Sequence, residues 1–154
     1  MQDLQWNCYP FEQLSPDLLY AVLQLRSEVF VVEQNCAYQD MDDYDQAAVH
    51  LTGQLENCLV CYTRLLPPGV KYDGIAIGRV ITKLSVRGDG YGKRLMQESI
   101  RYCHQHWPTA SITLSAQHYL EKFYSDLGFN TVSEIYMEDG IPHIEMLLDS
   151  IGAD

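Results

Sequence analysis

Two long stretches of the chain repeat apolar residues at the three- and four-residue spacing of an amphipathic helix. In the first, "SPDLLYAVLQLR", Ser15 is a typical N-cap and Pro16 occupies the first helical position. Its apolar face reaches Val29 and Phe30, where the β-branched segment "VFVV" leaves the end of the helix open. The second stretch covers residues 91–107. A short third helix is predicted over residues 119–128, where a glycine ends it.

The other apolar segments are short and separated by turn residues, which is typical of β-strands. A tight turn at Glu56 and Asn57 joins two of them. The predicted strands cover residues 4–9, 48–55, 59–66, 75–82, 111–116, 130–137 and 143–148. With the helices, the order is β-α-β-β-β-α-β-α-β-β. This order predicts the α/β class, with a mixed central β-sheet flanked by helices in a single domain over residues 1–154.

The composition is typical of a folded chain, and its charge argues against nucleic acid as a partner. Hydrophobic residues make up 47% of the 154 residues and charged residues 20%, unlike a disordered protein. Ten Lys and Arg residues against 21 Asp and Glu residues give a net charge of -11, which repels nucleic acid. An amine-bearing small molecule or peptide is electrostatically easier to bind, although an acidic surface can also serve solubility alone.

The cysteines and the N-terminal residues predict a reducing cytoplasm. Five cysteines are an odd number, and "MQDLQWNCYP" has neither the basic region nor the apolar run of a signal peptide. No apolar run is long enough to span a membrane, so we expect no membrane partner. Cys58 and Cys61 form C-x-x-C, but residues three apart on a strand face opposite sides, which argues against a metal ion or a disulfide.

Residues 36–46 form an acidic loop without periodicity. Its four aspartates suggest calcium, but the sixth position counted from Asp40 is Asp45 instead of glycine, and the twelfth is Leu51 instead of glutamate. This excludes an EF-hand. We expect no metal site, and a loop that is either solvated or faces an acceptor.

The stretch "VRGDGYGKR" carries the clearest chemistry. Gly88, Gly90 and Gly92 lie between a predicted strand and a predicted helix, where free backbone amides and the helix dipole attract anions. Arg87, Lys93 and Arg94 add positive charge in an otherwise acidic chain. We therefore expect a phosphate site. The alternative is a flexible connection with a solvated basic helix start. The spacing fits neither a P-loop nor a dinucleotide fingerprint.

Two motifs together point to a family. R-x-x-G-x-G, here Arg87, Gly90 and Gly92, resembles the acyl-CoA pyrophosphate loop of the GNAT superfamily of N-acetyltransferases. "FYSDLGF" at residues 123–129 is similar to the F-Y-x-x-L-G-F segment of the same superfamily. The segments at 25–42, 77–81 and 138–146 resemble the ElaA group of bacterial GNAT proteins. The resemblance covers nearly the whole chain and implies the GNAT fold.

The resemblance also implies roles for individual residues. Backbone groups of one strand would hold the acyl group and pantetheine arm of acetyl-CoA, the glycine loop would hold the pyrophosphate, and Tyr124 would protonate the leaving thiolate. Gln117 falls where many members have a cofactor-contacting Asn, and Leu120 where many have Ala. The implied cofactor-binding residues are Val80, Ile81, Thr82, Arg87, Gly88, Asp89, Gly90, Tyr91, Gly92, Lys93 and Gln117.

A general base, acting directly or through a chain of water molecules, must accept a proton from the attacking amine, and four residues are candidates: Glu33, His50, Glu134 and His143. Each lies in a stretch that we expect to border the acceptor cleft, and spacing selects none of them. His50 and His143 are also each explained as hydrogen-bonded structural groups, since a lone strand histidine is often structural.

The sequence therefore predicts a cytoplasmic, acetyl-CoA-dependent N-acetyltransferase. The amine would attack acetyl-CoA directly in a ternary complex, because no cysteine is placed to form an acyl-enzyme. A non-catalytic acyl-CoA-binding or sensor protein of the same fold is the alternative, since it would keep the glycine loop and need no base. The sequence specifies neither the amine acceptor, nor the oligomeric state, nor whether longer acyl chains are used.

Overall fold

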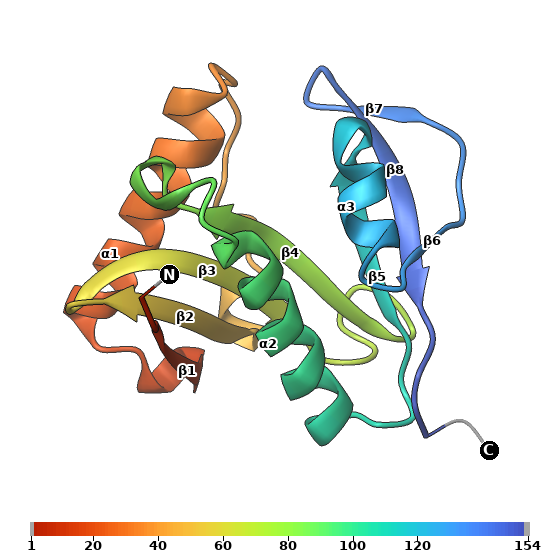
Figure 1. Cartoon of the computed structure of the whole chain (residues 1–154), viewed down its shortest axis with the longest axis horizontal. Coiled ribbons are helices and arrows are strands. Elements are labelled where there is room, and N and C mark those ends of the chain that lie inside the picture. Colours follow the sequence, from red (N-terminus) through yellow and green to blue (C-terminus); the bar gives the residue numbers. More distant parts are fainter. Residues whose placement is uncertain (1, 153–154) are drawn as a thin grey trace.

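A mixed eight-stranded sheet forms the centre of the molecule (Figure 1). The computed structural model describes residues 2–152, so residues 1 and 153–154 of the expected domain lie outside the described residues. The strand order is β1-β2-β3-β4-β5-β8-β6, and β7 pairs with β8. The strands are β1 (Gln5–Pro10), β2 (Val49–Leu55), β3 (Cys58–Leu66), β4 (Ile75–Thr82), β5 (Ile112–Gln117), β6 (Asn130–Thr131), β7 (Tyr136–Glu138) and β8 (Ile141–Leu148). The predicted α/β class, with helices flanking a mixed sheet, is confirmed.

Three α-helices flank the sheet: α1 (Pro16–Arg26), α2 (Tyr91–His106) and α3 (Glu121–Ser125). The side chain of Ser15 caps α1 by accepting a hydrogen bond of 3.1 Å from the amide of Leu18. The predicted first helix does continue beyond Arg26, but as a wider π-helical segment, η2 (Ser27–Glu33). Such segments are rare and are frequently found at functional sites.

The helices cover opposite faces of the sheet. Leu95 and Met96 of α2 and Tyr124 of α3 belong to one buried cluster, which includes Cys61 of β3. Side chains of α1 form a second cluster with Tyr62, the next residue of β3. Because consecutive strand residues point to opposite faces, α1 lies on one face and α2 and α3 on the other. In Figure 1, α2 crosses in front of the sheet and α1 lies behind it.

The predicted strand over residues 130–137 is wrong as one continuous element. It consists of the short strands β6 and β7, both paired with β8, with residues 132–135 between them. The hydroxyl of Ser133 accepts the amide of Glu145 at 2.8 Å, a hydrogen bond that interrupts the regular ladder. After this break, β7 pairs with residues 141–143 at the start of β8, next to the cleft described below.

None of the helices between residues 2 and 152 is long and apolar enough to cross a membrane. In the same range, no three His, Cys, Asp or Glu side chains come together as a possible metal site.

Candidate active site

A cleft opens in the middle of the sheet because β4 and β5 separate. These parallel strands pair only at Ile75 with Ile112 and at Ala76 with Thr113. Beyond these pairs the strands line opposite walls of a cavity of about 410 Å³, β4 through residues 77–82 and β5 through residues 114–117. Along this stretch β4 pairs with β3 only, so its other edge presents backbone groups to the cavity. An extended ligand can pair with such an edge as an additional strand would.

A bulge distorts β4 inside this cleft. The register between β3 and β4 passes from Tyr62 opposite Ile81 to Arg64 opposite Gly78, so Arg79 and Val80 together face only Thr63. Arg79 has a φ of 52°, in the left-handed region that non-glycine residues avoid at a cost of roughly 1–2 kcal/mol. The bulge therefore needs support from the surrounding structure.

The glycine loop leads from β4 into the N-terminus of α2, as predicted. Gly88 and Gly90 have φ values of 90° and 85°, which a residue with a side chain adopts only with strain. The first turn of α2 has no acidic residue and no side-chain cap, so its free amides can receive an anion. Gly92 lines the cleft, and a Cβ on Gly92 would lie 3.8 Å from side-chain atoms of both Phe123 and Thr82.

The side chains of this loop point in different directions. The side chain of Tyr91 is buried, and its hydroxyl donates a hydrogen bond of 2.9 Å to the carbonyl of Gln2. Only its backbone can therefore contribute to an anion site. Asp89 is exposed, and Lys93 lines a second groove together with Gln97 and Arg101. Among the basic side chains next to the loop, Arg87 is the one that lines the cleft.

Arg87 is held by an ion pair at the mouth of the cleft. Its Nε donates to the carbonyl of Thr82 at 2.9 Å, and its two terminal nitrogens donate to the carboxylate of Glu33 at 2.5 and 3.0 Å. Glu33, a candidate base in the sequence, is the last residue of η2 and also lines the cleft. Its carboxylate is thus occupied as the partner of Arg87.

His143 lies on the opposite wall in a chain of polar contacts. Its Nδ1 is 2.7 Å from the carbonyl of Ile141, and because a carbonyl only accepts, this nitrogen carries the proton. In the neutral ring, Nε2 then keeps its lone pair, 3.4 Å from a carboxylate oxygen of Glu138. The ring stacks on Tyr136 at 6.1 Å between centroids, and the Tyr136 hydroxyl bonds to Ser115. The geometry leaves His143 with one free proton-accepting atom.

The sheet register explains this cluster. His143 of β8 is directly opposite Gln117 of β5 on one side and Tyr136 of β7 on the other. Directly opposed residues point to the same face of a sheet, and Ser115 shares that face because it lies two residues before Gln117. Ser115, Gln117, Glu138 and His143 all line the cavity. Sequence reasoning missed Ser115, Tyr136 and Glu138, because only the pairing of distant strands brings them beside His143.

Tyr124 contributes a hydroxyl to the same cavity. It lies on α3, is 5% exposed and lines the cleft, and the structure gives its hydroxyl no hydrogen bond to residues 2–152. Burial, with a smaller contribution from the nearby Tyr119, raises the pKa of Tyr124 above its usual value. The hydroxyl therefore stays protonated at neutral pH and is available as a donor.

The two remaining base candidates lie outside the cavity lining. His50 is fully buried, with its ring nitrogens 2.6 Å from the Tyr62 hydroxyl and 2.9 Å from the Asp45 carbonyl. Burial lowers its pKa, so the ring is neutral and fully hydrogen-bonded, as expected for a structural histidine. Glu134 is exposed in the segment between β6 and β7. Of the four candidates, the structure brings only Glu33 and His143 into the cleft.

The acidic loop borders the cleft through Cys36 and Tyr38, but three of its four aspartates are held in ion pairs. Asp40 and Asp45 are buried, and Asp40, Asp42 and Asp45 form ion pairs with three arginines from three elements, Arg26, Arg64 and Arg79. Burial alone would raise the pKa of Asp42, but hydrogen bonds and the charge of Arg64 outweigh it and lower that pKa to about 2. The sequence did not predict these ion pairs, because the arginines are distant from the loop along the chain.

Comparison with known proteins places these features in context. The sequence profile of the Acetyltransferase (GNAT) domain matches residues 12–150. Protein ElaA of Escherichia coli strain K12 is 43% identical over 152 residues, which cover 97% of this chain and 99% of ElaA. The crystal structure of Escherichia coli ElaA matches with a TM-score of 0.90 at 42% identity, covering 95% of this chain and 99% of that chain. An acyl-CoA N-acyltransferase from Pseudomonas aeruginosa matches with a TM-score of 0.91 at 40% identity, with the same coverage of both chains.

Proposed function

The chain belongs to the GNAT family of acetyltransferases, and from this premise we propose that it transfers an acetyl group from acetyl-CoA to a primary amine in a ternary complex. One observation carries the proposal. A single cavity is lined by the free edge of β4, the start of the glycine loop, Tyr124 and His143. The description of the Pseudomonas aeruginosa relative as an acyl-CoA N-acyltransferase supports the same class of reaction.

The proposed cofactor site follows the cleft from the bulge to the glycine loop. Backbone groups of Val80, Ile81 and Thr82 would pair with the pantetheine arm, and an amide of this strand would stabilise the oxyanion. The free amides of residues 88–93 would receive the pyrophosphate, with Arg87 beside them. Gln117, on the opposite wall, would contact the arm. Ile81 is 1% exposed, so its side chain packs in the core and only its backbone serves the ligand.

The proposed chemistry assigns one proton transfer to each of two side chains. Nε2 of His143 takes a proton from the acceptor ammonium, with the Glu138 carboxylate beside it to attract that cation. The amine nitrogen then attacks the thioester carbon, the C–N bond forms, and the tetrahedral intermediate gives its second amine proton to solvent, to which His143 also returns the first. As the C–S bond breaks, the sulfur takes its electron pair and receives a proton from Tyr124, which solvent restores. The products are an N-acetyl amide and CoA.

The proposal is tested by measuring thiol release from acetyl-CoA with a panel of polyamines, amino acids, aminoglycosides and peptide N-termini. We expect at least one class to give turnover, and Tyr124→Phe to lower kcat about tenfold. The loss is modest because the thiolate of a thiol with a pKa of about 8.5 leaves readily. Tyr20→Phe, which removes a hydroxyl from an exposed position on α1, serves as control and should not change kcat. If CoA binds but no acceptor raises thiol release above hydrolysis, the non-catalytic acyl-CoA sensor is the better assignment.

The ion pair between Glu33 and Arg87 makes a separate prediction about cofactor affinity. Glu33 neutralises the basic side chain at the proposed pyrophosphate site, so Glu33→Gln should strengthen CoA binding by a few-fold to about tenfold. Isothermal titration with CoA measures this without any acceptor. Glu28→Gln makes the same charge change at an exposed position of η2 outside the cavity lining and should leave the affinity unchanged. Weaker binding by Glu33→Gln would mean that the ion pair instead holds the loop in its binding conformation.

A further inference from the structure

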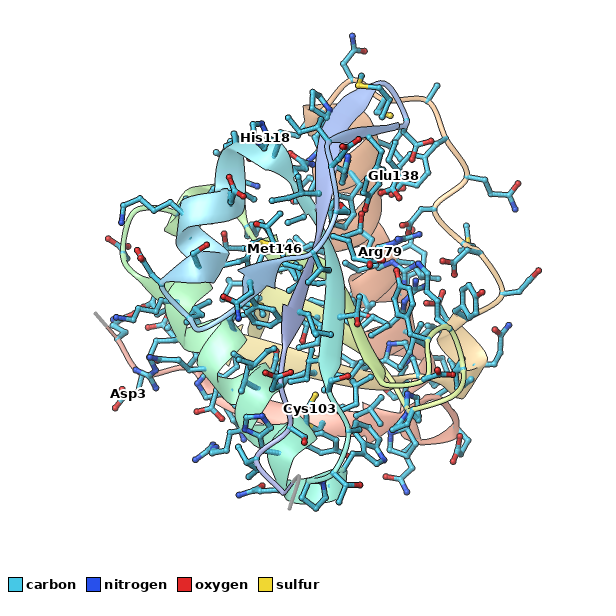
Figure 2. The ribbon with its side chains drawn as sticks, turned by 90° about the vertical axis from the view of Figure 1, so that its right-hand side faces the viewer. Asp3, Arg79, Cys103, His118, Glu138 and Met146 are labelled. Carbon is cyan, nitrogen blue, oxygen red and sulfur yellow. The ribbon has the colours of Figure 1, made fainter. Side chains whose placement is uncertain are left out.

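Arg79 connects two parts of the molecule that the proposed reaction needs in a fixed relation. It is the only residue of β4 with a positive φ, and it lies in the bulge next to Val80, where the strand turns its free edge to the cleft. Its side chain points toward the side of the molecule on which the loop of residues 36–46 runs (Figure 2). The backbone conformation and the side-chain contacts of this one residue are therefore coupled.

The side chain of Arg79 is 20% exposed and makes several polar contacts. Nε donates to a carboxylate oxygen of Asp40 at 2.7 Å, and Nη2 donates to the Asp40 carbonyl at 2.8 Å. Nη2 also lies 3.3 Å from the carboxylate of Asp42, and the guanidinium lies over the ring of Tyr38 at 5.9 Å. The planar guanidinium is thus fixed from several directions, which a flexible lysine could not reproduce.

Asp40 and Asp42, which accept hydrogen bonds from Arg79, are themselves held by other arginines. Arg26, from the last turn of α1, donates to the other carboxylate oxygen of Asp40 at 2.8 Å. Arg64, from β3, donates to both carboxylate oxygens of Asp42 at 2.7 and 2.8 Å. Arg26 and Asp40 are both buried, so their ion pair is shielded from water and salt, whereas the Asp42 side chain that pairs with Arg64 is 27% exposed. The loop is therefore a rigid support for Arg79, bound to the core on both sides.

We infer that Arg79 is a positioning residue, whose ion pairs with Asp40 and Asp42 hold the β4 bulge in the conformation that aims the strand's free backbone groups at the thioester carbonyl. The inference deepens the proposed function and rests on it, because it assumes that β4 binds the acyl group. It also gives the acidic loop a role, because its aspartates anchor the catalytic strand.

The strain of the bulge supports this assignment. An arginine adopts a positive φ only when its surroundings over-determine it, and glycine adopts the same φ without strain. Arg79→Met removes the ion pairs but keeps a Cβ, so the strained bulge should relax toward regular strand geometry. Arg79→Gly removes the ion pairs and the Cβ, so the positive φ carries no strain and the bulge should persist. Two substitutions at one position therefore separate anchoring from a general loss of stability.

The experiment uses acetyl-CoA labelled with ¹³C at the thioester carbonyl and needs no acceptor. Binding to the wild-type protein should move the carbonyl resonance downfield, because hydrogen bonding polarises the C=O bond. We expect Arg79→Met to lose most of this shift and Arg79→Gly to keep a larger part of it. Both variants should still bind CoA, since the pyrophosphate loop is untouched, and the shift is compared with the ligand fully bound. Arg101→Met, at an exposed arginine of α2, serves as the matched control.

The outcomes are distinguishable. The order wild type, Arg79→Gly, Arg79→Met in decreasing shift supports the inference, with thermal unfolding used to confirm that each variant is folded. The inference is overturned if the shift in Arg79→Met equals that of the wild type. It is also overturned if the shift in Arg79→Gly is no larger than that in Arg79→Met. Either result leaves the proposed function intact. If Arg79→Met fails to fold, Asp42→Asn replaces it, because this change weakens the ion pair between Arg79 and the half-buried Asp42. A carbonyl shift in Asp42→Asn as large as in the wild type then overturns the inference. If the wild type itself shows no shift, both the inference and the proposed polarisation by β4 are wrong.

Discussion

Replacing Gly90 by valine should reduce CoA affinity at least about 100-fold while leaving the protein folded. Gly90 precedes α2 with a φ of 85°, a conformation that a β-branched residue scarcely adopts. The loop would have to rearrange and withdraw its amides from the proposed pyrophosphate site. Charge-assisted hydrogen bonds contribute about 1.5–3 kcal/mol each, so losing two of them accounts for this decrease in affinity. Isothermal titration with CoA measures it, and circular dichroism follows the fold.

The chain offers a matched control for this substitution. Gly69 has a φ of 88° in the turn after β3, where a Cβ would meet nothing within 4 Å, and it takes no part in the cavity lining. Gly69→Val therefore introduces the same backbone strain, roughly 1–2 kcal/mol, away from the cleft. It should lower thermal stability slightly and leave CoA affinity unchanged. Equal CoA affinity in Gly90→Val and the wild type would remove the glycine loop from the cofactor site.

The features predicted well from the sequence are those encoded by neighbouring residues. Ser15 and Pro16 predict the start of α1 because a cap is a local interaction, and β4 occupies residues 75–82 as predicted. The glycine loop and the segment at 123–129 were enough to infer the GNAT resemblance, which the family match and the ElaA relative confirm. Local motifs specify the family because the cofactor, which family members share, is bound by local backbone geometry.

The features missed depend on residues that are far apart along the chain. Arg26, Arg64 and Arg79 give no sign in the sequence that they converge on one loop, and so the aspartates of that loop were expected to face solvent or acceptor. The bulge at Arg79 was not predicted either, since "IAIGRVIT" has the composition of an ordinary strand. Among the base candidates, sequence spacing could not separate His50 from His143, because each follows the same alternation of apolar neighbours. Only their burial and hydrogen bonds distinguish them.

His143→Gln should lower kcat/KM for the acceptor by a factor of about 10² to 10⁴, the usual contribution of a general base. Glutamine keeps a polar side chain of similar reach but cannot accept a proton at neutral pH. The affinity for acetyl-CoA should not change, because the proposed cofactor contacts lie on β4, on the glycine loop and at Gln117. Steady-state kinetics with an acceptor that gives turnover, together with titration of acetyl-CoA, separates the two quantities.

The pH dependence distinguishes a base from a residue that only shapes the cleft. If Nε2 of His143 takes the proton, kcat/KM of the wild type should fall on the acidic side as the ring becomes protonated, and His143→Gln should lose this dependence. A structural defect would lower the rate at all pH values and keep the slope. His118→Gln, at an exposed histidine outside the cavity lining, should keep both rate and slope. If His143→Gln retains wild-type kcat/KM, a water-relayed base is the better assignment for the proton acceptor. His143 is then a structural residue, held by its hydrogen bond to the Ile141 carbonyl.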